Sequence, residues 1–194
     1  MSKQTKFNRD DVIEKAKNLY WEKGYHATSM RNLQDVIDMR PGSIYAAFGS
    51  KENLFKEALN RYAQEGSDQL ANSMAQEETA LGGLKRFVRN VTLCNKDTVP
   101  SGMCMIVKSV AELTQDDNPD LLACATAILE SVESSFALIF QQAIDNGEIS
   151  EDKKPAELAR YLQVQIMGLK TYVQATNNLE AIEKLIDDVF AGLS

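Results

Sequence analysis

Apolar residues recur at steps of three and four along most of the chain, the spacing that places side chains on one face of an α-helix. Near the N-terminus this pattern predicts a helix over 10–23, begun by a cap at Asn8 or Arg9 and ended by Gly24. Further helices are expected over 82–93 and 103–113, from Pro119 to about 145, from Pro155 onward, and after a cap at Asn178. No stretch of useful length alternates as a strand does, so the sequence predicts an all-α fold.

Residues 28–55 hold a more specific pattern. Two short helices are predicted there, with apolar faces formed by Met30, Leu33 and Ile37 in the first and by Ile44 and Phe48 in the second. The helical spacing breaks between them, because Pro41 lacks an N–H and Gly42 is a poor helix-interior residue. A third helix is expected directly afterwards, capped by Ser50. This is the layout of a helix-turn-helix, whose second helix enters the major groove of DNA. The outer face of that helix carries small residues suited to close approach, namely Ser43, Ala46 and Ala47.

The same stretch closely resembles the DNA-binding signature of the TetR family of bacterial repressors, over about residues 8–62. The matching positions are Phe7, Asn8, Gly24, Tyr25, residues 28–30, residues 42–45, Phe48, residues 50–52, Leu54 and Phe55. The resemblance implies phosphate contacts from Thr28 and Lys51. It also implies that the turn and recognition helix present Arg40, Pro41, Gly42, Ser43 and Tyr45 to DNA.

The chain departs from the family pattern at four positions. Arg40 and Pro41 stand where many members have a small hydroxyl residue and a lysine, and Ala46 and Ala47 stand where many have aromatic residues or histidine. The resemblance therefore implies the mode of docking more strongly than the sequence of the operator.

The charge distribution changes what the formal net charge of −7 first suggests. Residues 1–51 contain nine Lys and Arg against six Asp and Glu, whereas residues 52–194 contain twelve against twenty-two. A mildly basic DNA-binding domain at 1–50 on a larger acidic domain at 51–194 fits this distribution. Because attraction to phosphate is then local, salt should screen it easily.

Composition points to an ordinary soluble protein, with 44% hydrophobic and 25% charged residues. No uninterrupted apolar run approaches the ~20 residues of a membrane span. The first residues also lack the apolar segment of a signal peptide. We therefore expect a cytoplasmic protein without a membrane partner.

The last two predicted helices, over 155–175 and 179–193, bear on assembly. The first has apolar residues on more than one side: Tyr161, Leu162, Val164, Ile166, Met167, Leu169, Tyr172 and Val173. These residues either pack within one subunit or form the symmetric four-helix dimer contact that the resemblance implies. DNA recognition favours the homodimer, because one short helix covers few base pairs and a dimer binds two half-sites.

A small-molecule effector is expected in the larger domain, because the helix after Ser50 continues from the DNA-binding domain and could be pivoted by a ligand. The predicted pocket residues are apolar or soft and lie on separate helices: Phe87, Met103, Cys104, Val107, Phe136, Phe140, Met167 and Tyr172. The alternative for each of them is ordinary core packing. A mainly apolar pocket would suit a hydrophobic or aromatic effector.

The cysteines match no zinc spacing, and the single histidine, His26, supplies no Cys/His cluster, so no metal and no cofactor is expected. Cys94 and Cys124 are interpreted as small buried hydrophobes. Cys104 is expected near a helix start, where the helix dipole lowers a thiol pKa. It is either a core residue or a sensor of thiol-reactive compounds, since residues 102–113 resemble a segment of some oxidant- and electrophile-responsive TetR-family regulators, apart from Met103 between the glycine and the cysteine.

Other classes of protein explain the chain less well. It has no phosphate-binding glycine loop, no nucleophile elbow and no metal-ligand cluster, so an enzyme is not expected. A helical dimeric adaptor without DNA-binding or catalytic activity remains as the alternative, but it leaves residues 28–51 unexplained. The sequence thus predicts a ligand-responsive transcriptional regulator, most simply a repressor released from a palindromic operator by a small apolar or thiol-reactive effector.

Overall fold

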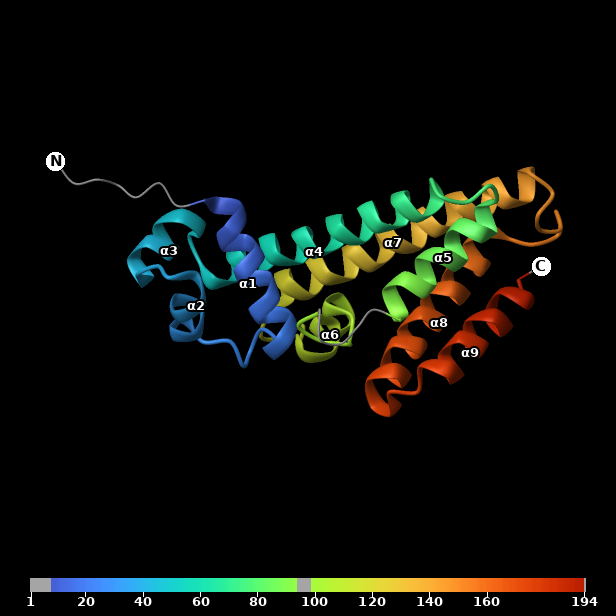
Figure 1. The fold of residues 1–194 in the computed structure, drawn as a ribbon. Helices are drawn as coiled ribbons and strands as arrows, with labels where there is room; N and C mark the ends of the chain where they lie inside the picture. Colours follow the sequence, from blue (N-terminus) through green and yellow to red (C-terminus); the bar gives the residue numbers. More distant parts are fainter. Residues whose placement is uncertain (1–7, 94–98, 194) are drawn as a thin grey trace.

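The computed structural model describes residues 8–93 and 99–193, and these residues form nine α-helices and no strands (Figure 1). The helices are α1 (Arg9–Lys23), α2 (Met30–Ile37), α3 (Pro41–Phe48), α4 (Lys51–Met74), α5 (Ala80–Thr92), α6 (Met105–Glu112), α7 (Pro119–Asp145), α8 (Pro155–Thr176) and α9 (Leu179–Ala191). The all-α prediction is confirmed, and the predicted helix ends lie within two residues of the observed ones. Cys94 lies outside the described residues.

Side-chain caps explain where several helices begin. The Asn8 side chain accepts hydrogen bonds from the backbone N–H groups of Asp10 and Asp11, which have no partner within α1. Ser29, Ser50, Thr79 and Asn178 cap α2, α4, α5 and α9 in the same way. The predicted caps at Ser50 and Asn178 are thus confirmed.

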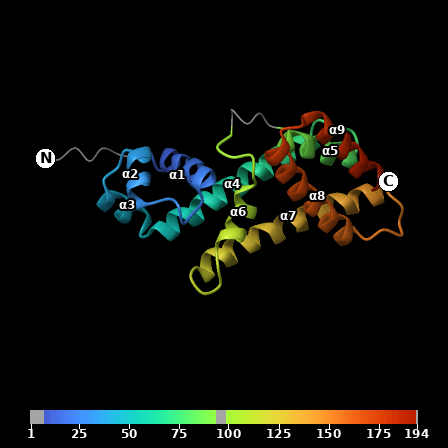
Figure 2. The ribbon, with the colours of Figure 1, turned by 90° about the horizontal axis from the view of Figure 1, so that it is seen from below.

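The molecule is elongated, with α1, α2 and α3 at one end and α5, α8 and α9 at the other (Figures 1 and 2). The long helices α4 and α7 run side by side along its length in both views. Helix α6 lies between the two ends and reaches the end of α1. Since α4 runs continuously from one end to the other, no flexible linker separates α1, α2 and α3 from the rest of the described structure.

Buried apolar side chains form two clusters along this length. The first joins α1, α2 and α3 to the start of α4, to α6 and to the first half of α7. The second joins α5, the second half of α7, α8 and α9. Apolar packing is therefore continuous across the domain boundary expected near residue 50, and it divides in the middle of α7.

Helix α7 is the one described helix long and apolar enough to cross a membrane, judged by length and composition alone. Glu130 and Glu133 interrupt its apolar sequence. Phe136 and Phe140 on the same helix are fully buried in the second cluster. Only 11% of that apolar stretch is buried, however, and Leu138 is 75% exposed, so packing within one subunit accounts for only part of its apolar character.

Candidate DNA-binding surface and effector cavity

The second helix of the helix-turn-helix, α3, has one buried face and one outward face. Ile44 and Phe48 are buried against the rest of the domain, as their spacing predicts. Gly42, Ser43 and Ala46 are exposed, and the Tyr45 side chain is 47% exposed. A methyl group placed on Gly42 would touch nothing within 4 Å. This short helix therefore offers a small-residue surface with one aromatic hydroxyl to a groove.

The turn between α2 and α3 contains a residue in the left-handed conformation and ends at the N-cap of α3. Asp38 ends α2 in the left-handed conformation at φ 57°. Arg40 occupies the N-cap position of α3, and Pro41 is at its first turn, where the missing N–H costs no hydrogen bond. Arg40 is exposed and forms no ion pair with any described residue. Arg40 is therefore an exposed basic residue directly before the first turn of α3.

A second exposed arginine lies nearby in the chain and was missed by the sequence reasoning. Arg31, in the first turn of α2, is exposed and has no ion pair among residues 8–93 and 99–193. In contrast, Arg9 is engaged by the Glu57 carboxylate and by the Ala47 carbonyl oxygen. A hydrophobic-periodicity argument does not detect Arg31, because it concerns only the buried face of α2.

The two residues expected to bind phosphate on either side of the helix-turn-helix have internal partners. Thr28 is 0% exposed, and its hydroxyl donates to the Gly24 carbonyl oxygen at 2.6 Å. The Lys51 ammonium donates to the Tyr25 carbonyl oxygen at 2.7 Å and lies 4.1 Å from the centre of the Tyr25 ring. Burial lowers the pKa of Lys51. The Thr28 hydrogen bond therefore closes the α1–α2 turn, and Lys51 ties that turn to the start of α4. The contacts of both residues with phosphate stay predictions.

Between the two apolar clusters lies a cavity of about 1030 Å³. Tyr62, Ile128 and Leu129 on its wall pack with the first cluster, and Phe87 and Phe136 belong to the second. The cavity therefore lies where apolar packing is interrupted along α4 and α7.

Five of the eight predicted pocket residues line this cavity: Phe87, Cys104, Val107, Phe136 and Met167. The other three lie elsewhere. Phe140 is fully buried in the second cluster, Tyr172 is 42% exposed on the outside of α8, and Met103 precedes α6 with its carbonyl oxygen bonded to Trp21. The direction in which each side chain faces depends on the neighbouring helices. The sequence pattern does not contain this information, so the prediction treated all apolar residues of these helices alike.

The thiols that the structure describes, Cys104 and Cys124, are both free and half-buried. Cys104 is the N-cap residue of α6 and lies on the cavity wall. Burial raises the pKa of the Cys124 thiol, which fits its interpretation as a small packing residue. Among the described residues no cluster of His, Cys, Asp and Glu could hold a metal ion.

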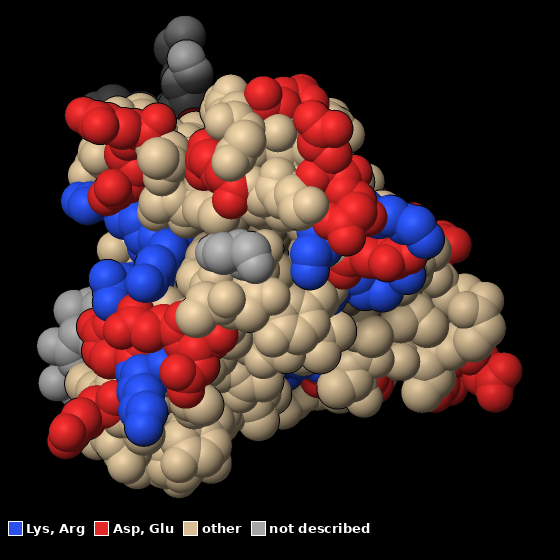
Figure 3. All heavy atoms as spheres, turned by 90° about the vertical axis from the view of Figure 1, so that its right-hand side faces the viewer, with Lys and Arg blue, Asp and Glu red and all other residues tan. Residues whose placement is uncertain are grey.

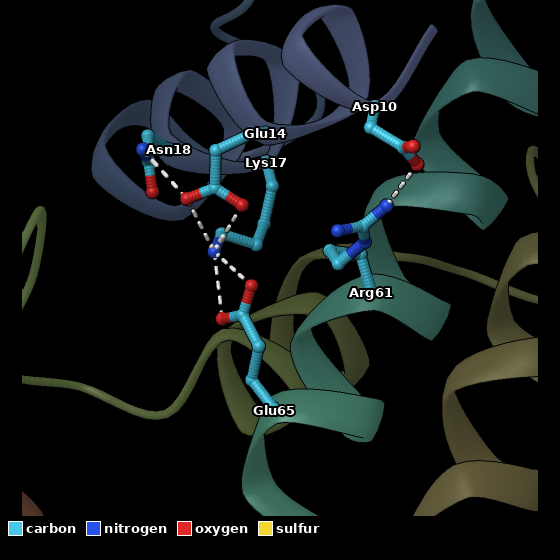
Figure 4. A network of polar contacts seen from close by, with 6 residues as sticks. All are labelled: Asp10, Glu14, Lys17, Asn18, Arg61 and Glu65. Carbon is cyan, nitrogen blue, oxygen red and sulfur yellow. Dashed lines mark hydrogen bonds and ion pairs between the residues drawn. The ribbon is translucent and has the colours of Figure 1, made fainter.

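Polar residues of α1 also line the cavity, and the sequence reasoning missed them. Lys17, only 3% exposed, lies between the carboxylates of Glu14 and Glu65 (Figure 4). Its Nζ is 2.8 Å from Glu14 Oε1 and 2.6 Å from Glu65 Oε1. Glu65 is on α4, so this network joins the first helix of the DNA-binding domain to α4 at the cavity wall. A positively charged residue within the buried face of an otherwise amphipathic helix was the available signal.

Helix α6 is bonded to the C-terminal end of α1. The Trp21 Nε1–H donates to the Met103 carbonyl oxygen at 2.6 Å. The Lys108 ammonium donates to the carbonyl oxygens of Trp21 and Glu22, at 3.3 and 2.7 Å. Glu112 accepts from the Tyr25 backbone N–H at 2.6 Å. Since Val107 of α6 lines the cavity, one short helix contacts both the cavity and the DNA-binding domain.

The outer face of α8 exposes apolar side chains. Tyr161, Val164 and Tyr172 are 43%, 57% and 42% exposed, and their spacing places them along one stripe. Gly168 lies in the same stripe, and nothing within 4 Å would meet a side chain there. From the end of the molecule that holds the C-terminus, a broad area without charged side chains is visible beside a region of paired acidic and basic ones (Figure 3).

The apolar stripe of α9, in contrast to the outer face of α8, is buried within the subunit. Ile182 and Ile186 are 0% exposed and pack in the second cluster with Val189. Leu169 of α8 is buried in the same cluster. For these residues the packing within one subunit, one of the two alternatives left by the sequence, is the correct one.

Two family signatures cover most of the chain. Residues 12–58 match the bacterial regulatory proteins of the tetR family, and residues 80–189 match the tetracyclin repressor-like C-terminal domain. The HTH-type transcriptional repressor ComR of Escherichia coli is 29% identical over 92% of this chain and 85% of its own length. The HTH-type transcriptional repressor BdcR of the same organism is 36% identical over 54% of this chain and 53% of its own length.

Solved structures share the whole fold. A cysteine mutant of the TetR-family regulator CifR, complexed with a 26-base-pair operator, superposes with a TM-score of 0.90 at 23% identity and covers all of both chains. The reduced form of E. coli NemR gives 0.80 at 19% identity, over 93% of this chain and 94% of its own. With a helix-turn-helix at one end and a family-specific C-terminal domain over more than half its length, the chain belongs to the tetR family of bacterial regulatory proteins and is a DNA-binding transcriptional regulator.

Proposed function

We propose that this regulator is a repressor that binds a palindromic operator as a homodimer and leaves it when a small effector occupies the cavity. The observation that carries the proposal is the position of the cavity: its wall includes α1, the first helix of the DNA-binding domain. A ligand there is in direct contact with the part of the protein that positions α3.

In the bound state, α3 of each protomer enters the major groove, and the two helices lie about 34–36 Å apart on successive turns of DNA. Arg40, at the start of α3, reaches bases, and Tyr45 bonds a phosphate. Pro41, Gly42 and Ser43 let the start of the helix approach closely. Exposed Arg31 adds a phosphate contact from α2, and Thr28 and Lys51 contribute through the turn that they hold.

The dimer forms through the exposed stripe of α8. Large apolar side chains on the surface of a monomer mark protein contacts when they gather in one patch. Gly168 destabilises an isolated helix by about 1 kcal/mol relative to alanine, and no close contact within the subunit requires it. We attribute it to close approach of the partner's helix, and we include exposed Leu185 of α9 in the contact.

Release follows from coupling between the cavity and α1. A ligand that wedges the two apolar clusters apart moves α6 and the Lys17 network, and both are bonded to α1. Such a ligand shifts the equilibrium only by its difference in affinity for the two states, and 1–3 kcal/mol is typical. Regulators of this family generally act by binding without catalysis, and this one acts in the cytoplasm on bacterial DNA.

Cys104 favours a second kind of effector. Its free thiol lies on the cavity wall at the start of α6, the helix that contacts α1. A bulky adduct on this sulfur would occupy the cavity as a reversible ligand does, so thiol-reactive compounds are the second candidate class.

The operator can be found and the proposal tested by selecting DNA from a random library with the full-length protein. We expect an inverted repeat with half-sites one helical turn apart. Arg40→Ala and Tyr45→Ala should each weaken binding to that sequence by about tenfold or more, the loss of one to a few kcal/mol per contact. Arg86→Ala is the matched control, because Arg86 pairs with Glu77 far from α3. If both α3 variants bind like the wild type while folded, α3 is not the recognition helix.

A further inference from the structure

One face of α8 borders the cavity along its length. Gln163, Ile166, Met167 and Lys170 line the wall, at the steps of three and four that place side chains on one side of a helix. The two apolar members are expected in a cavity between hydrophobic clusters. The two polar members require a separate reason, because polar groups in such a place are costly unless they are hydrogen-bonded.

Lys170 is 8% exposed, and its ammonium donates one hydrogen bond, to the Val91 carbonyl oxygen at 2.9 Å. Val91 lies in the last turn of α5, whose negative dipole end partly offsets the charge. An ammonium has three N–H groups, and no carboxylate among the described residues pairs with this one. Lys17 at the other side of the cavity differs, since two carboxylates surround it.

Gln163 lies on the same face of α8 and has an unsatisfied side-chain oxygen. Its Oε1 is buried and has no hydrogen-bond partner among the described residues. It precedes Lys170 by seven residues, which corresponds to about 10 Å along the helix axis. Because this oxygen is buried, a ligand in the cavity does not reach it without rotation of the side chain, and Lys170 is the charged group on this face of α8.

The apolar wall beside these groups is aromatic. The rings of Phe87 and Phe136 lie 6.0 Å apart at 60° to each other, and both residues border the cavity. Such a pair packs well against a flat ring or an alkyl chain. The cavity thus combines an apolar body with one buried cation that lacks a counterion in the described structure.

We propose that the effector is an organic anion, with an apolar or aromatic body packed against the Phe87–Phe136 pair and a carboxylate or sulfonate bound by Lys170. The anion supplies the missing charge partner, so its ion pair forms in a site of low dielectric, where it is stronger than in water. This inference rests on the proposed use of the cavity as the effector site.

Two fluorescent dyes with the same ring system test the assignment. 8-Anilinonaphthalene-1-sulfonate carries a sulfonate, and N-phenyl-1-naphthylamine lacks it. We expect Lys170→Met to weaken binding of the sulfonate dye by about tenfold, the effect of one charge-assisted contact. The neutral dye should bind wild type and variant within about twofold. Lys85→Met is the matched control, because Lys85 pairs with Asp187 outside this cavity. Lys170→Arg keeps the charge and should keep the preference for the sulfonate.

Three results would overturn the assignment. One is equal affinity of the sulfonate dye for wild type and Lys170→Met. Another is an equal loss of both dyes in that variant with the secondary structure intact, which would make Lys170 a packing residue. The third applies if Lys170→Met does not fold. In that case, loss of the preference for the sulfonate dye in Lys170→Arg, which keeps the positive charge, would show that this charge does not bind the sulfonate.

A cavity-filling variant separates this inference from the proposed function. Ser135, half-buried on α7, borders the cavity, and Ser135→Phe should weaken both dyes. If it weakens neither, the cavity takes no such ligand, and the effector site itself is refuted together with the role of Lys170. If it weakens both while Lys170→Met changes neither, the effector site stands and the anion does not.

Discussion

Replacement of Lys17 by methionine should destabilise the protein, because it breaks the link between α1 and α4 at the cavity wall. Methionine keeps most of the buried stem of the lysine, so the change removes mainly the ammonium. Two carboxylates then face each other without a counterion. Hydrogen bonds to charged groups contribute about 1.5–3 kcal/mol each when buried. Glu14 and Glu65 are 43% and 38% exposed, so water screens them, and we expect a loss of about 2 kcal/mol in total.

Thermal unfolding at fixed protein concentration measures this loss. For a chain of this length, 1 kcal/mol shifts Tm by about 2–4 °C, so Lys17→Met should unfold about 4–8 °C below the wild type near neutral pH. Lys15→Met is the matched control on the same helix. Lys15 pairs with Asp11 on the surface, with 41% and 53% of the side chains exposed, and its loss should cost less than about 1 kcal/mol.

The difference between wild type and Lys17→Met should depend on pH. Burial of the Glu14 carboxyl raises its pKa, but the hydrogen bond and charge of Lys17 outweigh burial and leave the pKa below its ordinary value of 4.5. A carboxyl with a lowered pKa in the folded state stabilises the protein above its unfolded pKa and loses this contribution as pH falls through the folded pKa. The difference in Tm should therefore shrink below about pH 4.5. Equal stability of the two proteins at pH 7 would mean that the ion pairs only offset the desolvation of Lys17, and the reasoning would be refuted.

Three further predictions concern assembly, coupling and the thiol. Val164→Glu should give a folded monomer by analytical ultracentrifugation, whereas Leu169→Glu, on the buried face of α8, should give unfolded protein; a folded Val164→Glu dimer would place the interface elsewhere. Trp21→Phe leaves the Met103 carbonyl without its hydrogen bond and should lower the free energy of unfolding by about 1–3 kcal/mol in urea titrations, and no change would show that α6 does not support α1. N-Ethylmaleimide should release DNA from the wild type but not from Cys104→Ser, and equal release from both would return Cys104 to a packing role.

Local features of the sequence determined the helices and the DNA-binding motif. Three helices begin at residues whose side chains cap them, namely Asn8, Ser50 and Asn178. Pro41 is the first residue of α3 and prevents α2 from continuing into it. These boundaries therefore depend on residues within one helical turn. The outward face of α3 follows from the same local logic, because Ile44 and Phe48 can be buried on only one side. Such features can be predicted without knowledge of any neighbouring helix.

Only the tertiary structure decided which side of each longer helix faces the cavity, the apolar core or solvent. Phe136 and Phe140 are one turn apart on α7 and both are fully buried, yet only Phe136 borders the cavity. Burial of Lys17 and Lys170 could not be read from periodicity, since a lysine is normally exposed and each is buried through contacts with groups distant in sequence. The cavity exists because the two apolar clusters do not pack fully against each other. Its wall is formed by residues of α1, α4, α5, α6, α7 and α8, so it depends on how six helices pack together and not on the sequence pattern of any one of them.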